Sequence, residues 1–115
     1  MAQYVLLLRD NGSFPTDMSG EEMQAIIRRY KAWSDGLRAE GRFKGGEKLK
    51  DREGRLMRRG SSGVSVTDGP FAEAKEIIGG FFVIEAASYE DAVKRANDCP
   101  HLDFGTIEVR EIDQI

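Results

Sequence analysis

Several features that mark secreted, membrane-bound and metal-binding proteins are missing from this sequence. Cys99 is the single cysteine, so no disulfide can form within the chain, and a reducing compartment fits best. No stretch approaches the roughly 20 consecutive apolar residues that a helix needs to cross a bilayer. The N-terminus has neither a basic region nor a small-residue cleavage site. We therefore expect a cytoplasmic protein with no membrane partner.

Recognisable catalytic and metal-binding motifs are also scarce. The chain has one histidine, His101, and no group of cysteines and histidines with the spacing of a metal site. It has no glycine-rich phosphate loop and no serine nucleophile elbow. Asp98 precedes Cys99, and its negative charge disfavours a reactive thiolate. These absences favour a protein that uses no cofactor and no metal.

The net charge of −3 conceals an uneven distribution. Residues 28–59 hold 12 of the 17 basic residues and 5 of the 20 acidic ones, so this segment carries +7 and the remainder −10. A basic segment raises the hypothesis of a nucleic-acid partner. Acidic residues interrupt it, however, and its charges are spread over a predicted helix end, a strand and a turn. We expect a solvated surface and no nucleic-acid partner.

The spacing of apolar residues predicts two amphipathic helices among several short strands. The expected elements are, in chain order, a strand at 4–8, a helix from a capping box at 19–22 through residue 37, a weak strand at 43–49, a short strand or hairpin arm at 56–59, a half-buried strand at 64–67, a connector at 72–78, a strand at 80–84, a helix at 88–96 and a strand at 106–112. The length suits a single domain over residues 1–115.

This order of elements predicts an α+β fold of the ferredoxin-like, split βαβ kind, with two helices on one face of an antiparallel sheet. The runs at 4–8 and 80–84 are apolar at every position, which is typical of strands buried on both faces. Two helices cover only one face of such a sheet. We therefore predict that a second copy of the chain covers the other face, in a homodimer.

Residues 68–80 carry a resemblance to a known family. They read Asp-Gly-Pro-Phe-Ala-Glu-Ala-Lys-Glu-Ile-Ile-Gly-Gly, which resembles the signature of the YCII-related family, in the branch named for its Asp-Gly-Pro-Phe motif. The opening strand, the helix with Trp33, Pro100 after the second helix and the ending at 105–110 match as well. The resemblance covers nearly the whole chain.

The resemblance implies a ferredoxin-like fold that pairs as a dimeric α+β barrel. The role of the family is largely unassigned. Some members are fused or adjacent to extracytoplasmic-function sigma factors, a distant relative acts on chlorinated hydroquinones, and related barrels include muconolactone isomerase. In some relatives a histidine on the first helix pairs with an aspartate. Residues 28–30 of this chain are Arg-Arg-Tyr instead, so that dyad is not carried over.

The first candidate residues lie in and after the Asp-Gly-Pro turn. Asp68 either shapes the turn by accepting backbone hydrogen bonds or directs its carboxylate into a cleft between the sheet and the partner. Glu73, Lys75 and Glu76 follow closely. They form either a surface ion-pair cluster or a site where a lysine beside carboxylates takes part in proton transfer.

His101 is the second catalytic candidate, because histidine is the usual proton shuttle near neutral pH. A lone histidine in a loop is also common as a simple surface residue. If a dyad with an acid exists here, its partner is Asp68 or Asp103.

Two residues of the last strand and one of the first form a third candidate group. Glu108 and Arg110 are two apart, so they share a face of the strand. If Ile107 and Val109 face the helices, this pair faces the dimer side, where Arg9 can join it. A buried arginine–carboxylate pair either orients an acidic ligand or fixes the interface.

The sequence thus favours a small-molecule ligand in a cleft between sheet and partner. If the protein is an enzyme, the available acids and bases suit isomerase or lyase chemistry. The alternative is a non-catalytic regulatory or interaction protein, associated with an extracytoplasmic-function sigma factor. A cavity holding polar groups favours the first hypothesis, and a solidly packed interface favours the second.

Overall fold

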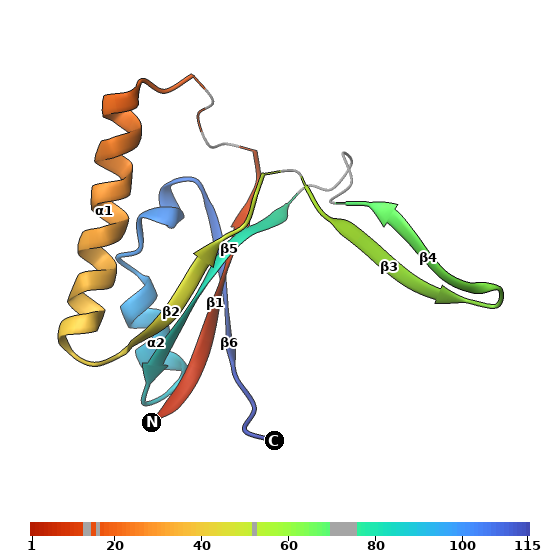
Figure 1. Cartoon of the computed structure of the whole chain (residues 1–115). Helices are drawn as coiled ribbons and strands as arrows, with labels where there is room; N and C mark the ends of the chain where they lie inside the picture. The colour runs from red at the N-terminus through yellow and green to blue at the C-terminus, as the bar shows by residue number, and fades with distance from the viewer. Residues whose placement is uncertain (13–14, 16, 52, 70–75) are drawn as a thin grey trace.

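The computed structural model describes residues 1–12, 15, 17–51, 53–69 and 76–115. Figure 1 shows a sheet with helices on one side and a separate hairpin. The elements are β1 (Ala2–Asp10), α1 (Gly20–Ala39), β2 (Phe43–Lys48), β3 (Arg55–Gly60), β4 (Gly63–Asp68), β5 (Ile77–Ala86), α2 (Tyr89–Ala96), the 3₁₀ turn η1 (Pro100–Asp103) and β6 (Gly105–Glu111). No helix among these described residues is long and apolar enough to cross a membrane.

Four strands form the main sheet in the order β2-β5-β1-β6, and every neighbouring pair is antiparallel. The strands β3 and β4 pair only with each other. The expected mixture of antiparallel strands and two helices is therefore confirmed. The prediction of a connector at 72–78 is wrong for its last two residues, because Ile77 and Ile78 belong to β5 and pair with β1. Its residues 72–75 lie outside the described part of the chain.

Both helices begin where the sequence signals a cap. The hydroxyl of Ser19 accepts the backbone N–H of Glu22 at 3.1 Å, and the Glu22 carboxylate accepts the backbone N–H of Ser19 at 3.3 Å. This capping box satisfies two amide groups that the first turn leaves without helical partners. At the start of α2, the Ser88 hydroxyl alone acts as the cap, by accepting the backbone N–H of Asp91. Helix α1 ends before Gly41, whose φ of 72° favours glycine.

The hydrophobic core lies between the sheet and the two helices. In the central strand β1, alternate residues Tyr4, Leu6 and Leu8 point toward the helices and are buried. Other buried members of this core are Leu37 of α1, Ile84 and Ala86 of β5, and Ala92 and Ala96 of α2. The Trp33 ring packs edge-on against Phe82 of β5, with centroids 5.0 Å apart. This packing holds the C-terminal half of α1 close to the sheet.

The opposite face of the sheet also presents apolar side chains. Val5 and Leu7 of β1 pair with Val83 and Phe81 of β5, and all four are only partly buried. Both helices pack on the other face, around Leu6 and its neighbours, so no described helix covers this one (Figure 1). We call these four side chains the open-face stripe. The two central strands are thus apolar on both faces, as their sequence predicts.

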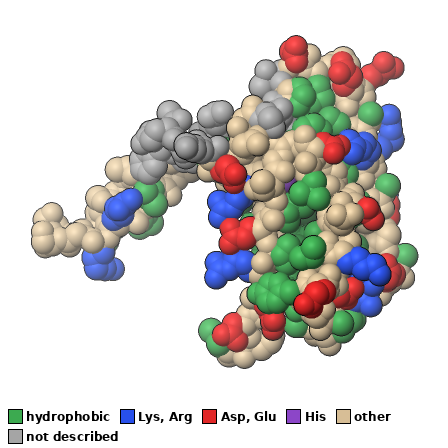
Figure 2. Space-filling model, turned by 180° about the vertical axis from the view of Figure 1, so that it is seen from behind, with side chains coloured by type: hydrophobic (Ala, Val, Ile, Leu, Met, Phe, Trp, Pro, Cys, Tyr) green, Lys and Arg blue, Asp and Glu red, His purple; other side chains and the backbone are tan. Residues whose placement is uncertain are grey.

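The β3–β4 hairpin extends away from the rest of the molecule, as Figures 1 and 2 show. The radius of gyration is 16.3 Å, against about 13 Å for a compact chain of this length. Met57 and Val66 face each other across the hairpin and are 65% and 56% exposed. Since an isolated two-stranded hairpin is marginally stable in water, such an arm is expected to need a packing partner.

Candidate functional site

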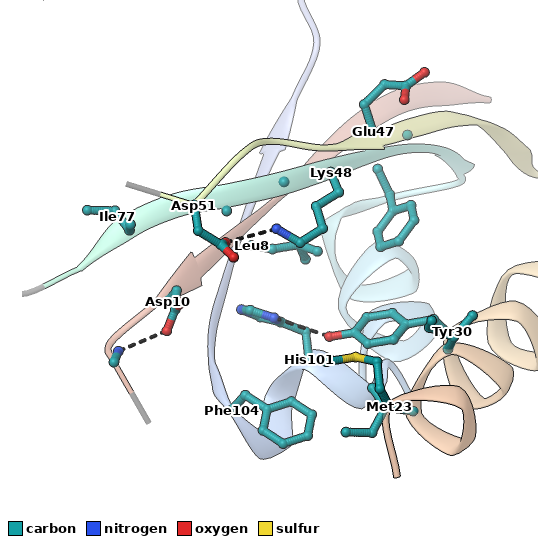
Figure 3. Close-up of a pocket in the computed structure, with 17 residues that line it drawn as sticks. Leu8, Asp10, Met23, Tyr30, Glu47, Lys48, Asp51, Ile77, His101 and Phe104 are labelled. Atoms are coloured by element: carbon teal, nitrogen blue, oxygen red, sulfur yellow. Dashed lines mark hydrogen bonds and ion pairs between the residues drawn. The ribbon is translucent and has the colours of Figure 1, made fainter. Parts of the chain in front are cut away.

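A cavity of about 590 Å³ lies between the N-terminal half of α1 and the end of the sheet (Figure 3). This volume is within the usual range for small-molecule sites. The cavity is lined by Leu8, Asp10, Gly12, Met23, Ile26, Ile27, Tyr30, Gly46, Glu47, Lys48, Asp51, Ile77, Gly79, Gly80, Phe82, His101 and Phe104. It lies on the helix side of the sheet, whereas the sequence placed a cleft on the side of the partner.

Glycines in the sheet explain why the cavity exists. At the end of the sheet near Trp33, large side chains fill the space beneath α1. At the other end, Gly46, Gly79 and Gly80 line the cavity and leave it open. A Cβ on Gly46 would collide with the Phe82 ring, and one on Gly80 would lie 2.9 Å from the carbonyl oxygen of Glu47. These positions require glycine for close packing, and their lack of side chains enlarges the cavity.

His101 and Tyr30 form the polar inner wall of the cavity. His101 is 7% exposed, and its Nε2 lies 2.8 Å from the carbonyl oxygen of Arg9. Because a carbonyl only accepts hydrogen bonds, Nε2 carries the proton and donates it. The Nδ1 atom of the neutral ring is then an acceptor, and the Tyr30 hydroxyl donates to it over 3.4 Å. One histidine therefore ties the 3₁₀ turn to β1 and to α1 at once.

The Tyr30 hydroxyl is kept in its neutral form. The pKa of Tyr30 is raised to about 12, chiefly by burial; Cys99, Asp103 and Asp10 contribute to this rise, while Arg29 opposes it. At neutral pH this side chain is therefore a hydrogen-bond donor or a weak general acid.

Acidic and basic side chains line another part of the cavity. Lys48 donates to the carboxylate of Asp51 at 2.9 Å and to the carbonyl oxygen of Leu49 at 2.8 Å. Asp10 accepts the backbone N–H of Gly12 at 2.8 Å. Figure 3 shows Glu47 pointing away from the cavity. The groups that face the cavity are thus a Lys48–Asp51 ion pair and the Asp10 carboxylate.

The candidate group on the first and last strands lies on the open face of the sheet. Arg9 binds Glu108 through Nη2 at 2.6 Å and through Nε at 3.0 Å. Arg110 Nε lies 3.9 Å from the other carboxylate oxygen of Glu108. Ile107 and Val109 pack against the core, as expected from the alternation. These three candidates therefore come together, but on the opposite side of the sheet from the cavity.

Asp68 lies at the end of the hairpin, and 93% of its side chain is exposed. Its carboxylate is 3.4 Å from Nη1 of Arg55, and it is not among the residues that line the cavity. The structure shows no contact between Asp68 and His101. Asp103, the other acid considered as a partner for that histidine, instead pairs with Arg29 at 2.6 Å. Glu73 and Lys75 lie outside the described residues.

Sequence reasoning missed Tyr30, Asp10 and Lys48 as cavity residues. Tyr30 follows the apolar spacing of α1, which is typical of a residue that packs in the core. The glycine pairs at 45–46 and 79–80 were the available signal for a space beneath the helix. The sequence alone does not show where these glycines lie in the sheet. Strand pairing determines this, because it places Gly46 beside Phe82 and Gly80 beside Leu8.

Cys99 is buried at 3% exposure, and this burial raises the pKa of its thiol to about 11, although a backbone hydrogen bond from His101 lowers it slightly. The sequence attributes a raised thiol pKa to the neighbouring Asp98, whereas the largest cause in the structure is burial. Among the described residues, no group of three or more histidine, cysteine or acidic side chains is arranged to hold a metal ion.

Comparison with known proteins identifies a family and a relative that each match nearly the whole chain. The family model described as a YCII-related domain matches residues 2–115. An uncharacterized protein from Rhizobium meliloti (strain 1021) is 30% identical over 112 residues, which span 95% of this chain and 90% of that protein. This relative is itself uncharacterized, so the comparison supplies a family and no activity.

Proposed function

We propose that this chain, which belongs to the YCII-related domain family, binds a small organic molecule in the cavity beneath α1. The function of that family is uncharacterised, so the proposal rests on the geometry of the cavity. One observation carries the proposal. The cavity of about 590 Å³ has a mostly apolar lining, and the half-buried Tyr30 is hydrogen-bonded to the buried His101 in its wall. Concave sites with few, well-placed polar groups are typical of ligand pockets.

The residues at the cavity suit proton transfer without a cofactor. Tyr30 would accept a hydrogen bond from the ligand through the lone pairs of its oxygen, and His101 would take part by exchanging a proton with the tyrosine. The Asp10 carboxylate would act as the base or as a hydrogen-bond acceptor. Isomerase or lyase chemistry fits such a pair of acid and base. His101 thus keeps its role as a catalytic candidate, and Asp68 is assigned to shaping the hairpin end.

We also propose that the main sheet and its helices form a ferredoxin-like unit of the Asp-Gly-Pro-Phe branch, and that two copies pair through the open-face stripe. The stripe is apolar and is flanked by the Arg9–Glu108 pair on one side and the Lys44–Glu85 pair, 3.3 Å apart, on the other. An apolar centre with a polar rim is typical of protein interfaces. The exposed hairpin would pack against the same partner, and Glu73 and Lys75 follow it in the chain.

Light scattering at micromolar concentration tests the pairing. The wild-type protein should have about twice the chain mass, and Phe81→Asp should give monomer or aggregate, because an unpaired charge cannot be buried without a large cost. Val93→Asp is the matched control, since Val93 is exposed on α2. A wild-type protein that stays monomeric as its concentration rises would overturn the dimer.

A fragment screen by thermal shift tests the cavity. Ile27 lines it and is 49% exposed, so Ile27→Trp should fold normally while filling the space. Ala25→Trp puts the same side chain on α1, at a position that does not line the cavity. Fragments that stabilise the wild type and Ala25→Trp, but not Ile27→Trp, are the expected result. If no fragment distinguishes the two variants, the ligand proposal fails and a non-catalytic interaction role becomes the better hypothesis.

A further inference from the structure

We infer that the ligand of this cavity is a compact apolar molecule bearing a cationic amine, whose N–H groups meet Asp10. This inference rests on the proposed function and names its ligand class. Asp10 is the last residue of β1, and its side chain lines the cavity. One of its oxygens accepts the backbone N–H of Gly12 at 2.8 Å. The carboxylate therefore has further acceptor positions for a ligand.

Among the described residues, no ion pair joins a basic side chain to Asp10, and one basic side chain of each of β1, β2 and α1 is engaged with another acid. Lys48 of β2 is held by Asp51 and by a carbonyl oxygen. Arg9 of β1 pairs with Glu108 on the other face of the sheet. Arg29 of α1 binds Asp103 at 2.6 Å. A cation from the ligand would supply the charge that these side chains do not.

The rest of the polar wall also presents acceptors. Tyr30 donates its single hydroxyl proton to His101 Nδ1, so its oxygen offers lone pairs to the cavity. His101 uses its own proton on the carbonyl oxygen of Arg9. Near Asp10, the described residues would therefore offer an anionic ligand a carboxylate of like charge, whereas an ammonium group would meet two acceptors.

The apolar residues of the cavity indicate that the uncharged part of the ligand is apolar. Met23 and Ile27 approach from α1, Phe104 from the turn before β6, and Leu8 from the sheet. Figure 3 shows Met23 and Phe104 near the Tyr30–His101 pair, with Asp10 at a separate position. A short arylalkyl or branched alkyl amine matches an apolar surface with one charged end.

Three probes of nearly equal shape test the charge preference by calorimetric titration at neutral pH. These probes are 2-phenylethylamine, which is cationic, 2-phenylethanol, which is neutral, and phenylacetate, which is anionic. Since charge-assisted hydrogen bonds are the stronger ones, the amine should bind about tenfold or more tightly than the alcohol, and the acid should bind most weakly. Tighter or equal binding of the alcohol or the acid overturns the inference.

Variants show whether Asp10 causes the preference. Asp10→Asn keeps an oxygen for the Gly12 N–H and should fold normally, while weakening the amine about tenfold and changing the alcohol less than twofold. Glu108→Gln, on the other face of the sheet, should leave all three affinities unchanged. An amine affinity that survives Asp10→Asn also overturns the inference. Failure of all three probes overturns it too, whereas the proposed function falls only if the fragment screen fails as well.

Discussion

His101 supports the fold as well as the cavity, so its removal should cost measurable stability. His101→Ala deletes the 2.8 Å bond to the Arg9 carbonyl and the 3.4 Å bond from Tyr30, within a site where the histidine is 7% exposed. Each bond contributes about 1 kcal/mol, and loss of ring packing adds to this. The free energy of unfolding should fall by about 2–3 kcal/mol. At about 4–8 °C per kcal/mol for small domains, the melting temperature should drop by roughly 10–20 °C.

Urea denaturation with a double-mutant cycle measures this effect. Tyr30→Phe should cost up to about 1 kcal/mol in the wild type and close to nothing in His101→Ala, because the bond is then already lost. Gln24→Ala, at an exposed position of α1, is the control and should stay within about 0.5 kcal/mol of wild type. Equal costs of Tyr30→Phe in both backgrounds, or a wild-type midpoint for His101→Ala, would refute the described bonding.

Three further outcomes follow from the fold. Because burial raises the pKa of Tyr30 from the ordinary 10 to about 12 in the folded state, the free energy of unfolding should fall between pH 10 and 12. In urea titrations at alkaline pH, the free energy of unfolding of Tyr30→Phe should fall less over this pH range than that of the wild type. Cys99 should react with a thiol reagent only at the rate of unfolding, and prompt labelling of the native protein would contradict its burial. Ser19→Ala should cost about 1 kcal/mol in thermal melts, and no loss would show the cap to be dispensable.

Local patterns were sufficient to predict most elements of the body. The caps at Ser19 and Ser88 mark both helix starts, since a serine hydroxyl can satisfy an amide of the first turn. Alternation along 106–112 correctly separates Ile107 and Val109 from Glu108 and Arg110. These features depend only on neighbours in the sequence, which is why they could be predicted.

The cavity could not be predicted, because it depends on which strands are neighbours. Asp10, Tyr30, Lys48 and His101 come from four elements and meet only after β1 has paired with β5 and β6, and β5 with β2. Asp68 is the opposite case, because it stands out in the sequence but does not line the cavity. It belongs to a turn motif, yet it lies on a hairpin that is not part of the main sheet. Turn chemistry fixes local backbone shape and gives no information about the distant residues that surround it.

The two ends of the chain leave the same end of the sheet (Figure 1). There, the backbone N–H of Ile112 donates to the carbonyl oxygen of Gln3 at 2.8 Å. The turn at 61–62, by contrast, lies at the exposed tip of the hairpin. A short linker could therefore join the ends while new termini open at that tip, since circular permutation succeeds at exposed turns when the original ends are close. We therefore expect a chain permuted in this way to form a sheet with the same order of strands.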